Sequence, residues 1–145
     1  MRLSTRGRYG VKALFELALH QGEGPLSLKA IARGQGLSEH YLEQLMGLLR
    51  NSGLVRSARG PQGGYVLGRD ASEITVGDII RTMEGPIALT DCTAAEPGAV
   101  EHCGRAEGCM AHTVWSRVTQ RILEVVDSIT LADLCRDFRA AGGRS

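Results

Sequence analysis

The sequence lacks any apolar run of the roughly eighteen residues that a membrane-spanning helix requires. Its first twenty residues are basic and then apolar, as in a secretory signal peptide, but Glu16 and His20 interrupt the apolar part. The small-residue cleavage pattern of a signal peptide is also missing. We therefore expect this segment to form a helix of the mature protein, and we expect a cytoplasmic protein without a membrane partner.

The short motifs that mark common enzyme classes are missing too. The sequence has no GxxxxGK(S/T) phosphate loop, no HExxH zinc-protease helix, no GxSxG nucleophile turn and no CxxC redox pair. One glycine-rich stretch, at 60–64, is not followed by Lys and Ser or Thr, so it does not fit a phosphate-binding loop. We therefore expect no catalytic residues and no enzymatic activity.

Charge is distributed unevenly along a chain whose formal net charge is only +1. Residues 1–69 contain ten Lys and Arg against four Asp and Glu, whereas residues 70–145 contain seven against twelve. A basic half indicates a surface that faces nucleic acid, and an acidic half indicates a surface with another role. Solvated faces of opposite charge would produce the same imbalance, so this interpretation needs support from local patterns.

The basic half carries the pattern of a helix-turn-helix. Residues 5–20 place apolar side chains at helical spacing. Ser27 caps a short second helix, which ends in a glycine-containing turn at 34–36. Ser38 then caps a third helix, over 39–52. Two helices joined by such a turn form the helix-turn-helix that many DNA-binding proteins use.

A hairpin and a fourth helix complete the expected DNA-binding domain. Two β-rich runs, at 54–60 and 64–69, flank a Pro-Gln-Gly turn, which predicts the wing that commonly follows a helix-turn-helix. Thr75 begins the next helix, with Asp78 placed to close a capping box. We therefore expect a winged helix-turn-helix domain over residues 1–85.

A non-periodic segment and a long helix follow. Residues 86–108 show no hydrophobic periodicity, and loops of that length inside a small domain are generally functional or disordered. Apolar residues then recur at heptad-like spacing, at Ala111, Trp115, Val118, Ile122, Val125 and Ile129. This stripe predicts a dimerisation helix that packs against a second copy, and Thr130 caps a last helix within 110–145. The predicted fold is mainly α with a small β-hairpin.

The third helix contains most of the expected DNA-contacting residues. Its side opposite the core presents polar side chains from the N-terminal half, namely Ser38, His40, Tyr41, Glu43 and Gln44. Helix-turn-helix proteins place this end against base edges in the major groove. Gln44 suits adenine, Glu43 suits cytosine N4, and Arg59 of the wing suits phosphate or the minor groove. Each residue alone would also fit a solvated surface. A homodimer of such domains predicts a palindromic operator in double-stranded DNA.

The cysteines indicate a metal site. In a reducing cytoplasm, thiols serve metal or redox chemistry more often than disulfides. Cys92, Cys103 and Cys109 have the spacing C-x10-C-x5-C, and His112 lies one helical turn after Cys109. Such a set fits zinc or an iron–sulfur cluster, and the spacing does not separate the two. Inert thiols and a surface histidine are the alternatives, and Cys135 falls on an apolar helix face, as a core residue would.

Five stretches of the chain resemble the Rrf2 family of bacterial transcription regulators. They are MRLSTRGRYG (1–10), LSEHYLEQLMGLLRNSGLV (37–55), RGPQGGYVLGRD (59–70), ITVGDIIRTMEG (74–85) and ITLADL (129–134). Together they extend over nearly the whole chain, and the run from YLEQL to RGPxGGY is highly specific. Within the family, the chain resembles the iron–sulfur cluster regulators of the IscR type.

This resemblance implies a homodimeric repressor or activator that uses an iron–sulfur cluster as a redox sensor. Regulators of the IscR type bind a [2Fe–2S] cluster through three cysteines and a histidine. The resemblance therefore implies the ligands Cys92, Cys103, Cys109 and His112, in a cluster-binding loop over 86–110. It also implies that Glu43 filters between classes of DNA site.

Two departures from that pattern leave alternatives open. The gap between Cys92 and Cys103 is ten residues, longer than in regulators of the IscR type, so Glu101 or His102 could replace a ligand. Nitric-oxide sensors of the family hold a [4Fe–4S] cluster with a ligand at the position of Arg8, and arginine is a poor ligand, so [2Fe–2S] is favoured. A regulator without a cluster, based on zinc or reactive thiols as in the CymR type, is the other alternative.

Overall fold

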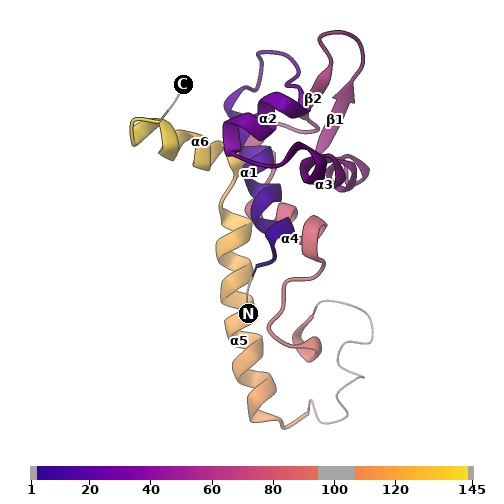
Figure 1. Cartoon of the computed structure of the whole chain (residues 1–145). Helices are drawn as coiled ribbons and strands as arrows, with labels where there is room; N and C mark the ends of the chain where they lie inside the picture. The colour runs from indigo at the N-terminus through magenta and orange to yellow at the C-terminus, as the bar shows by residue number, and fades with distance from the viewer. Residues whose placement is uncertain (1–2, 95–106, 144–145) are drawn as a thin grey trace.

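The computed structural model describes residues 3–94 and 107–143. Its elements are α1 (Thr5–Leu19), α2 (Leu28–Gln35), α3 (Glu39–Asn51), β1 (Val55–Ala58), β2 (Gly64–Leu67), η1 (Ala71–Glu73), α4 (Val76–Glu84), η2 (Asp91–Thr93), α5 (Met110–Ser128) and α6 (Leu131–Ala140). The prediction of a mainly helical fold with a small hairpin is confirmed. We call α1 to α4 with the hairpin the body, and η2 with α5 the arm, which extends away from the body (Figure 1).

Capping side chains begin these helices where the sequence predicts them. Ser27 and Ser38 each accept a hydrogen bond from the amide three residues further on. Thr75 and Thr130 each form a reciprocal capping box with the aspartate three residues further on. Such caps satisfy amides that have no partner inside the helix, and so they fix where each helix starts.

The turn between α2 and α3 begins later than predicted. α2 continues through Gly34, and the chain turns only at Gly36, whose φ of 66° is the left-handed conformation that favours glycine. Gly34 serves another purpose, because a Cβ atom there would lie 2.4 Å from the carboxylate of Glu16 on α1. The first glycine therefore permits close approach of two helices, and the second makes the turn.

The wing is attached to the body by a short backbone bridge. β1 and β2 pair antiparallel from Val55↔Leu67 to Ala58↔Gly64, and they are shorter than the predicted runs because the turn occupies 59–63. On the other edge of β2, Leu26 and Tyr65 exchange two backbone hydrogen bonds of 3.0 and 2.7 Å. A Cβ atom at Gly64 would lie 2.1 Å from the Leu26 carbonyl oxygen, so the glycine permits this pairing.

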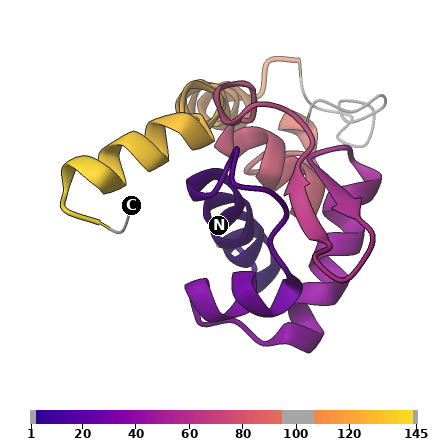
Figure 2. The same cartoon turned by 90° about the horizontal axis from the view of Figure 1, so that it is seen from above.

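An apolar core holds the body together around α1, which packs on α2, α3, α4 and α6 (Figure 2). Four apolar side chains on the inner side of α3 are at most 1% exposed, and they are Leu42, Leu45, Met46 and Leu49. Burying a side chain of this size contributes roughly 1.5–3 kcal/mol to folding. The body therefore buries the helical stripe that the sequence predicts.

The last helix, α6, folds back against α1. The rings of Phe15 and Phe138 meet edge to face, with centroids 5.2 Å apart and an interplanar angle of 87°. Cys135 is 4% exposed, which confirms that it is a core residue. Burial raises the pKa of the Cys135 thiol, and the nearby charge of Arg139 opposes that shift.

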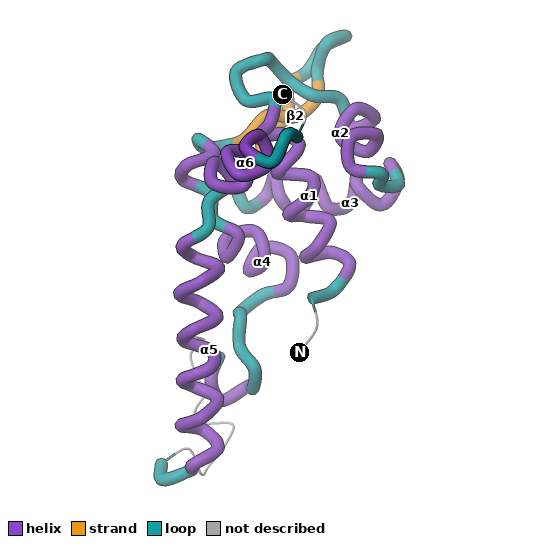
Figure 3. The backbone as a smooth tube through the Cα atoms, turned by 90° about the vertical axis from the view of Figure 1, so that its left-hand side faces the viewer, coloured by secondary structure: helices purple, strands orange, loops and turns teal. Residues whose placement is uncertain are grey.

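The long helix of the arm touches the body mainly near its C-terminal end (Figures 1 and 3). There the Arg81 guanidinium forms two hydrogen bonds with the Asp127 carboxylate, of 2.9 and 2.7 Å. Three residues of the predicted stripe face solvent, since Trp115, Val118 and Val125 are 41%, 40% and 57% exposed, whereas Ile122 and Ile129 are half-buried. No helix among the described residues combines the length and the apolar character needed to cross a bilayer.

Candidate functional site

Helix α3 presents the predicted polar residues on its outer side. Ser38, His40, Glu43 and Gln44 are exposed, whereas the opposite side of the helix is in the core. The Ser38 hydroxyl also accepts a hydrogen bond of 3.4 Å from the amide of Tyr41, so its first role is to begin the helix. The side of α3 that the sequence assigns to DNA is therefore the side that solvent reaches.

Tyr41 differs from the other predicted DNA-contacting residues because it is half-buried. Its ring packs edge to face against Tyr9 of α1, with centroids 5.6 Å apart. The Lys12 ammonium lies 5.8 Å from the centroid of the Tyr9 ring, within the range of a cation–π contact. Tyr41 therefore joins α3 to α1, and only the solvent-facing part of its ring is available to a partner.

The arginines near the wing have different surroundings. Arg59 is exposed at the start of the turn between the two strands, and Arg56 is exposed on β1. Arg69 lies beyond β2, where its guanidinium is 3.8 Å from the carboxylate of Asp78 on α4. Arg59 is therefore well placed to reach a partner beyond the wing, whereas Arg69 is paired with the body.

A buried carboxylate supports the helix-turn-helix from within, and little in the sequence indicates its role. Glu16 of α1 is 3% exposed and accepts a hydrogen bond of 2.6 Å from the side-chain amide of Gln35, the last residue of α2. His20 lies 3.4 Å from the other carboxylate oxygen. From the sequence, Glu16 only interrupts an apolar stretch. The available signal was its place between Ala13 and Leu17, on a face that the core covers.

Two of the four predicted metal ligands are in contact. Cys92 lies in η2 and His112 in the first turn of α5, and the distance from Cys92 Sγ to His112 Nδ1 is 3.4 Å. Both side chains are half-buried. Figure 1 shows η2 beside the lower half of α5, far from the wing. The fold of the arm therefore brings a thiol and an imidazole together across twenty residues of sequence.

Of the other predicted ligands, Cys109 lies among the described residues, and it does not gather with this pair into a metal-binding group. Cys109 is the half-buried N-cap residue of α5, and its carbonyl accepts a hydrogen bond from the amide of Thr113. Cys103 lies outside the described residues, as do Glu101 and His102. Within residues 3–94 and 107–143, no three Cys, His, Asp or Glu side chains gather closely enough to hold a metal ion. Sulfur and imidazole nevertheless suit zinc or iron–sulfur chemistry rather than magnesium or calcium.

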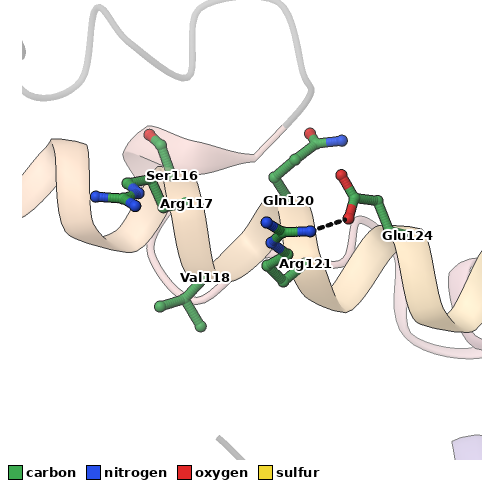
Figure 4. Close-up of a pocket in the computed structure, with 6 residues that line it drawn as sticks. All are labelled: Ser116, Arg117, Val118, Gln120, Arg121 and Glu124. Carbon is green, nitrogen blue, oxygen red and sulfur yellow. Dashed lines mark hydrogen bonds and ion pairs between the residues drawn. The ribbon is translucent and has the colours of Figure 1, made fainter.

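Part of the α5 surface forms a hollow that nothing in the described chain covers. Figure 4 shows the residues that line it, which are Ser116, Arg117, Val118, Gln120, Arg121 and Glu124. Arg121 and Glu124 form an ion pair of 3.1 Å within it. Val118 is the one lining residue that belongs to the predicted apolar stripe, and the other five are polar or charged.

Comparison with known proteins relates these features to bacterial regulators. Residues 3–137 match the Rrf2 family, described as an iron-dependent transcriptional regulator. Over 134 residues, or 92% of this chain, the sequence is 49% identical to the HTH-type transcriptional regulator CymR of Bacillus subtilis, covering 89% of that protein. The corresponding figures for IscR of Serratia proteamaculans are 46% and 79%. The solved structure of T. potens IscR aligns with a TM-score of 0.79 and 47% identity, over 100% of this chain and 93% of that chain.

Proposed function

Because the chain belongs to the Rrf2 family of transcriptional regulators, we propose that it is a homodimeric, DNA-binding regulator that senses iron–sulfur or redox status through an iron–sulfur cluster. The contact between Cys92 Sγ and His112 Nδ1, at 3.4 Å, carries the cluster part of this proposal. The exposed polar side of α3 beside the wing supports the DNA-binding part. These two features lie at opposite ends of the molecule (Figure 1).

In the proposed complex, the N-terminal half of α3 enters the major groove and the wing contacts the sugar–phosphate backbone. Gln44 reads adenine, His40 and Ser38 contact bases or phosphates, and Arg59 contacts phosphate or the minor groove. Tyr41 contributes through the part of its ring that does not pack on Tyr9. The exposure of Gln44, His40 and Arg59 supports these assignments.

Glu43 sets the sequence selectivity in this proposal. A carboxylate on the DNA-facing side of a helix is repelled by phosphate, unless a cytosine amino group lies opposite to donate a hydrogen bond. We therefore expect Glu43→Ala to broaden the set of bound sequences and Gln44→Ala to weaken the preference for adenine by about 1–3 kcal/mol. A binding-site selection on double-stranded oligonucleotides measures both changes. Unchanged preferences in both variants would contradict the assignment.

Two copies of the chain pair through the outward face of α5. Trp115, Val118 and Val125 are exposed on that face at heptad spacing, and a second copy would remove them from water. Such a dimer brings two recognition helices to a palindromic operator. We expect Val118→Glu to yield monomers in sedimentation equilibrium. Gln62→Glu, in the turn of the wing, is the control and should leave the dimer intact.

The proposed cluster ligands are Cys92, Cys103, Cys109 and His112, with [2Fe–2S] favoured over [4Fe–4S]. When bound, the cluster would supply a centre that changes its charge on oxidation and reduction. The chain itself supplies the connection: residues 86–90 join Cys92 to the C-terminal end of α4, and His112 is on α5, which carries the dimer face. A structural change at Cys92 and His112 would therefore alter how the body lies relative to the second copy.

Protein purified without oxygen tests the proposal. We expect visible absorbance, iron and acid-labile sulfide in the wild-type chain, and their loss in Cys103→Ala together with altered DNA affinity or site preference. Cys135→Ala is the matched control, because Cys135 is buried under α6 and should not affect the colour. A chain that holds neither iron nor sulfide after reconstitution would refute the cluster and leave a plain operator-binding dimer.

A regulator based on zinc or reactive thiols is the second candidate. The similar identities to CymR and IscR relatives, 49% and 46%, keep it in consideration. Colourless protein that contains zinc, or that contains no metal and responds to oxidants through its thiols, would favour this candidate over the cluster.

A further inference from the structure

A row of hydroxyl groups connects the Cys92–His112 pair to the inner side of α5. Ser116 and Thr119 follow His112 at helical spacing and face the segment that contains η2. The Ser116 hydroxyl lies 3.4 Å from His112 Nε2, on the far side of the ring from Cys92. Thr119 is 3% exposed, which makes it the single buried residue of α5, a helix that is described in full. The arm is therefore held internally by polar contacts.

The Thr93 hydroxyl donates one hydrogen bond and accepts two, which is the full capacity of a hydroxyl group. Its proton is donated to the carbonyl of Thr90 at 2.9 Å. Its oxygen accepts from the Thr119 hydroxyl at 3.3 Å and from the Thr90 amide at 3.3 Å. A hydroxyl has one proton and two lone pairs, so no capacity remains.

Among the residues that the structure describes, Cys92 Sγ is therefore the neighbouring acceptor left for the proton of the Thr90 hydroxyl. Thr90 Oγ1 lies 3.1 Å from Thr93 Oγ1, whose lone pairs are already used, and 3.2 Å from Cys92 Sγ. We propose that Thr90 donates a hydrogen bond to the Cys92 sulfur, and that Thr119 is the positioning residue that holds Thr90 and Thr93 for this purpose. This inference rests on the proposed function, since it assigns Thr90 a role at a cluster ligand.

The contacts of Thr119 fit that positioning role. Its oxygen accepts the backbone amide of Leu89 at 3.4 Å while its hydroxyl donates to Thr93, so one side chain holds both ends of the 89–93 segment against α5. A valine in its place would keep the shape, but it would leave the Leu89 amide and the Thr93 oxygen without this partner.

A hydrogen bond to a ligating sulfur draws electron density away from the cluster. The reduced cluster carries one more negative charge than the oxidised cluster, so the bond stabilises the reduced state and raises the reduction potential. Thr90 would thereby set the redox poise at which the sensor responds. Clusters held by the same types of ligand can differ in reduction potential for this reason alone.

Thr90→Val removes the donor and keeps the size of the side chain. In reconstituted full-length protein we expect a lower midpoint potential with unchanged iron and sulfide content, and we expect Thr90→Ser to restore the wild-type value. Thr82→Val is the control, because the Thr82 hydroxyl bonds to a helix carbonyl of α4 instead. A midpoint potential in Thr90→Val equal to that of the wild type would overturn the assignment.

Metal-free protein separates this inference from the proposed function. In this metal-free protein, Thr90→Val should slow alkylation of Cys92 relative to that of Cys109 by about threefold. A rate ratio of that size corresponds to one hydrogen bond of typical net strength. Thr119→Val should speed hydrogen exchange of the Leu89 amide by about tenfold, and Thr119→Ser should not. If the chain binds no cluster, the proposed function fails while these two measurements still decide the inference. Equal alkylation rates, or equal exchange rates, would overturn it.

Discussion

The body and the arm of this molecule are stabilised in different ways. In the body, α3 alone buries four large apolar side chains to 1% exposure or less, and α1 is surrounded by other helices. In the arm, α5 is longer than any helix of the body, yet it buries only Thr119. Trp115, Val118 and Val125 of its apolar stripe face solvent, and Thr119 forms hydrogen bonds with the 89–93 segment. The body completes its own core, whereas the arm leaves apolar side chains exposed to solvent.

This difference separates stability from responsiveness. A packed core resists partial change, because each side chain depends on its neighbours. An arm held mainly by a few hydrogen bonds and a thiol–imidazole contact should open locally at a lower free-energy cost than the packed core of the body. Under the proposed function, this arrangement would keep the DNA-reading body fixed while a distant site alters how the body lies relative to a second copy.

The largest expected effect tests the core of the body. Leu49→Ala removes a side chain that is fully buried beneath α3, and we expect the free energy of unfolding to fall by about 3 kcal/mol. Leu48→Ala is the matched control on the same helix. Its side chain is 39% exposed, so the free energy of unfolding should fall by less than about 1 kcal/mol. Urea unfolding followed by circular dichroism measures both. Similar losses in the two variants would contradict a self-contained core.

The next effect concerns the one carboxylate that the body buries. Glu16→Ala removes the acceptor of the 2.6 Å hydrogen bond from Gln35, and we expect a loss of about 2 kcal/mol, as for hydrogen bonds to charged groups. Glu23→Ala removes the other carboxylate near His20, which is 65% exposed, and should change the stability little. The same urea titration compares them. If Glu16→Ala lowered the free energy of unfolding no more than Glu23→Ala does, the buried carboxylate would contribute little to the stability of the body.

The helix starts could be predicted from the sequence, whereas the reason for one glycine could not. Helical spacing and caps are local signals, so Ser27, Ser38, Thr75 and Thr130 could be recognised as helix starts, and these are confirmed. Gly34 could not be assigned correctly, because its reason for being glycine is Glu16, eighteen positions earlier in the sequence.

For the candidate sites, the sequence supplied the residue types and the structure supplied the pairing. The sequence grouped Cys92, Cys103, Cys109 and His112 and used spacing to join Cys109 with His112, whereas the contact in the structure is between Cys92 and His112. The metal site itself stays a prediction. Spacing did not suggest Thr90 or Thr119, because threonines carry no motif and their roles depend on which segment lies against α5. The half-burial of Tyr41 also depends on a neighbour, Tyr9, that helical periodicity within α3 does not reveal.

A smaller effect is expected where the arm meets the body. Arg81→Lys replaces the two-pronged contact with Asp127 by a single one, and we expect a loss of less than about 1 kcal/mol because both partners are 38% and 42% exposed. Hydrogen exchange of amides near the C-terminal end of α5 should nevertheless increase. Arg121→Lys, whose ion pair with Glu124 lies within the arm, should leave those amides unchanged. Equal exchange in the two variants would show that this junction does not depend on the Arg81 fork.

The smallest effect depends on pH and concerns the start of α6. The backbone amide of Thr130, and then its hydroxyl, lower the pKa of the Asp133 carboxyl below its usual value of 3.8. A carboxyl whose pKa is lower in the folded chain than in the unfolded chain stabilises the fold above the unfolded pKa, and this contribution is lost as the pH falls through the folded pKa. Asp133→Asn should therefore lower the urea midpoint slightly at about pH 5 and leave it nearly unchanged at about pH 2.5.

Asp137→Asn is the control for that measurement, since this carboxylate lies one turn further along α6 with its side chain 73% exposed. Its urea midpoint should follow the wild type more closely than that of Asp133→Asn at both pH values. The capping box of α6 follows a backbone bridge between Ile74 and Leu131 that ties α6 to the body. A midpoint difference between Asp133→Asn and the wild type that persisted unchanged in acid would mean that the asparagine acts through packing there, and not through the carboxylate charge that begins the helix.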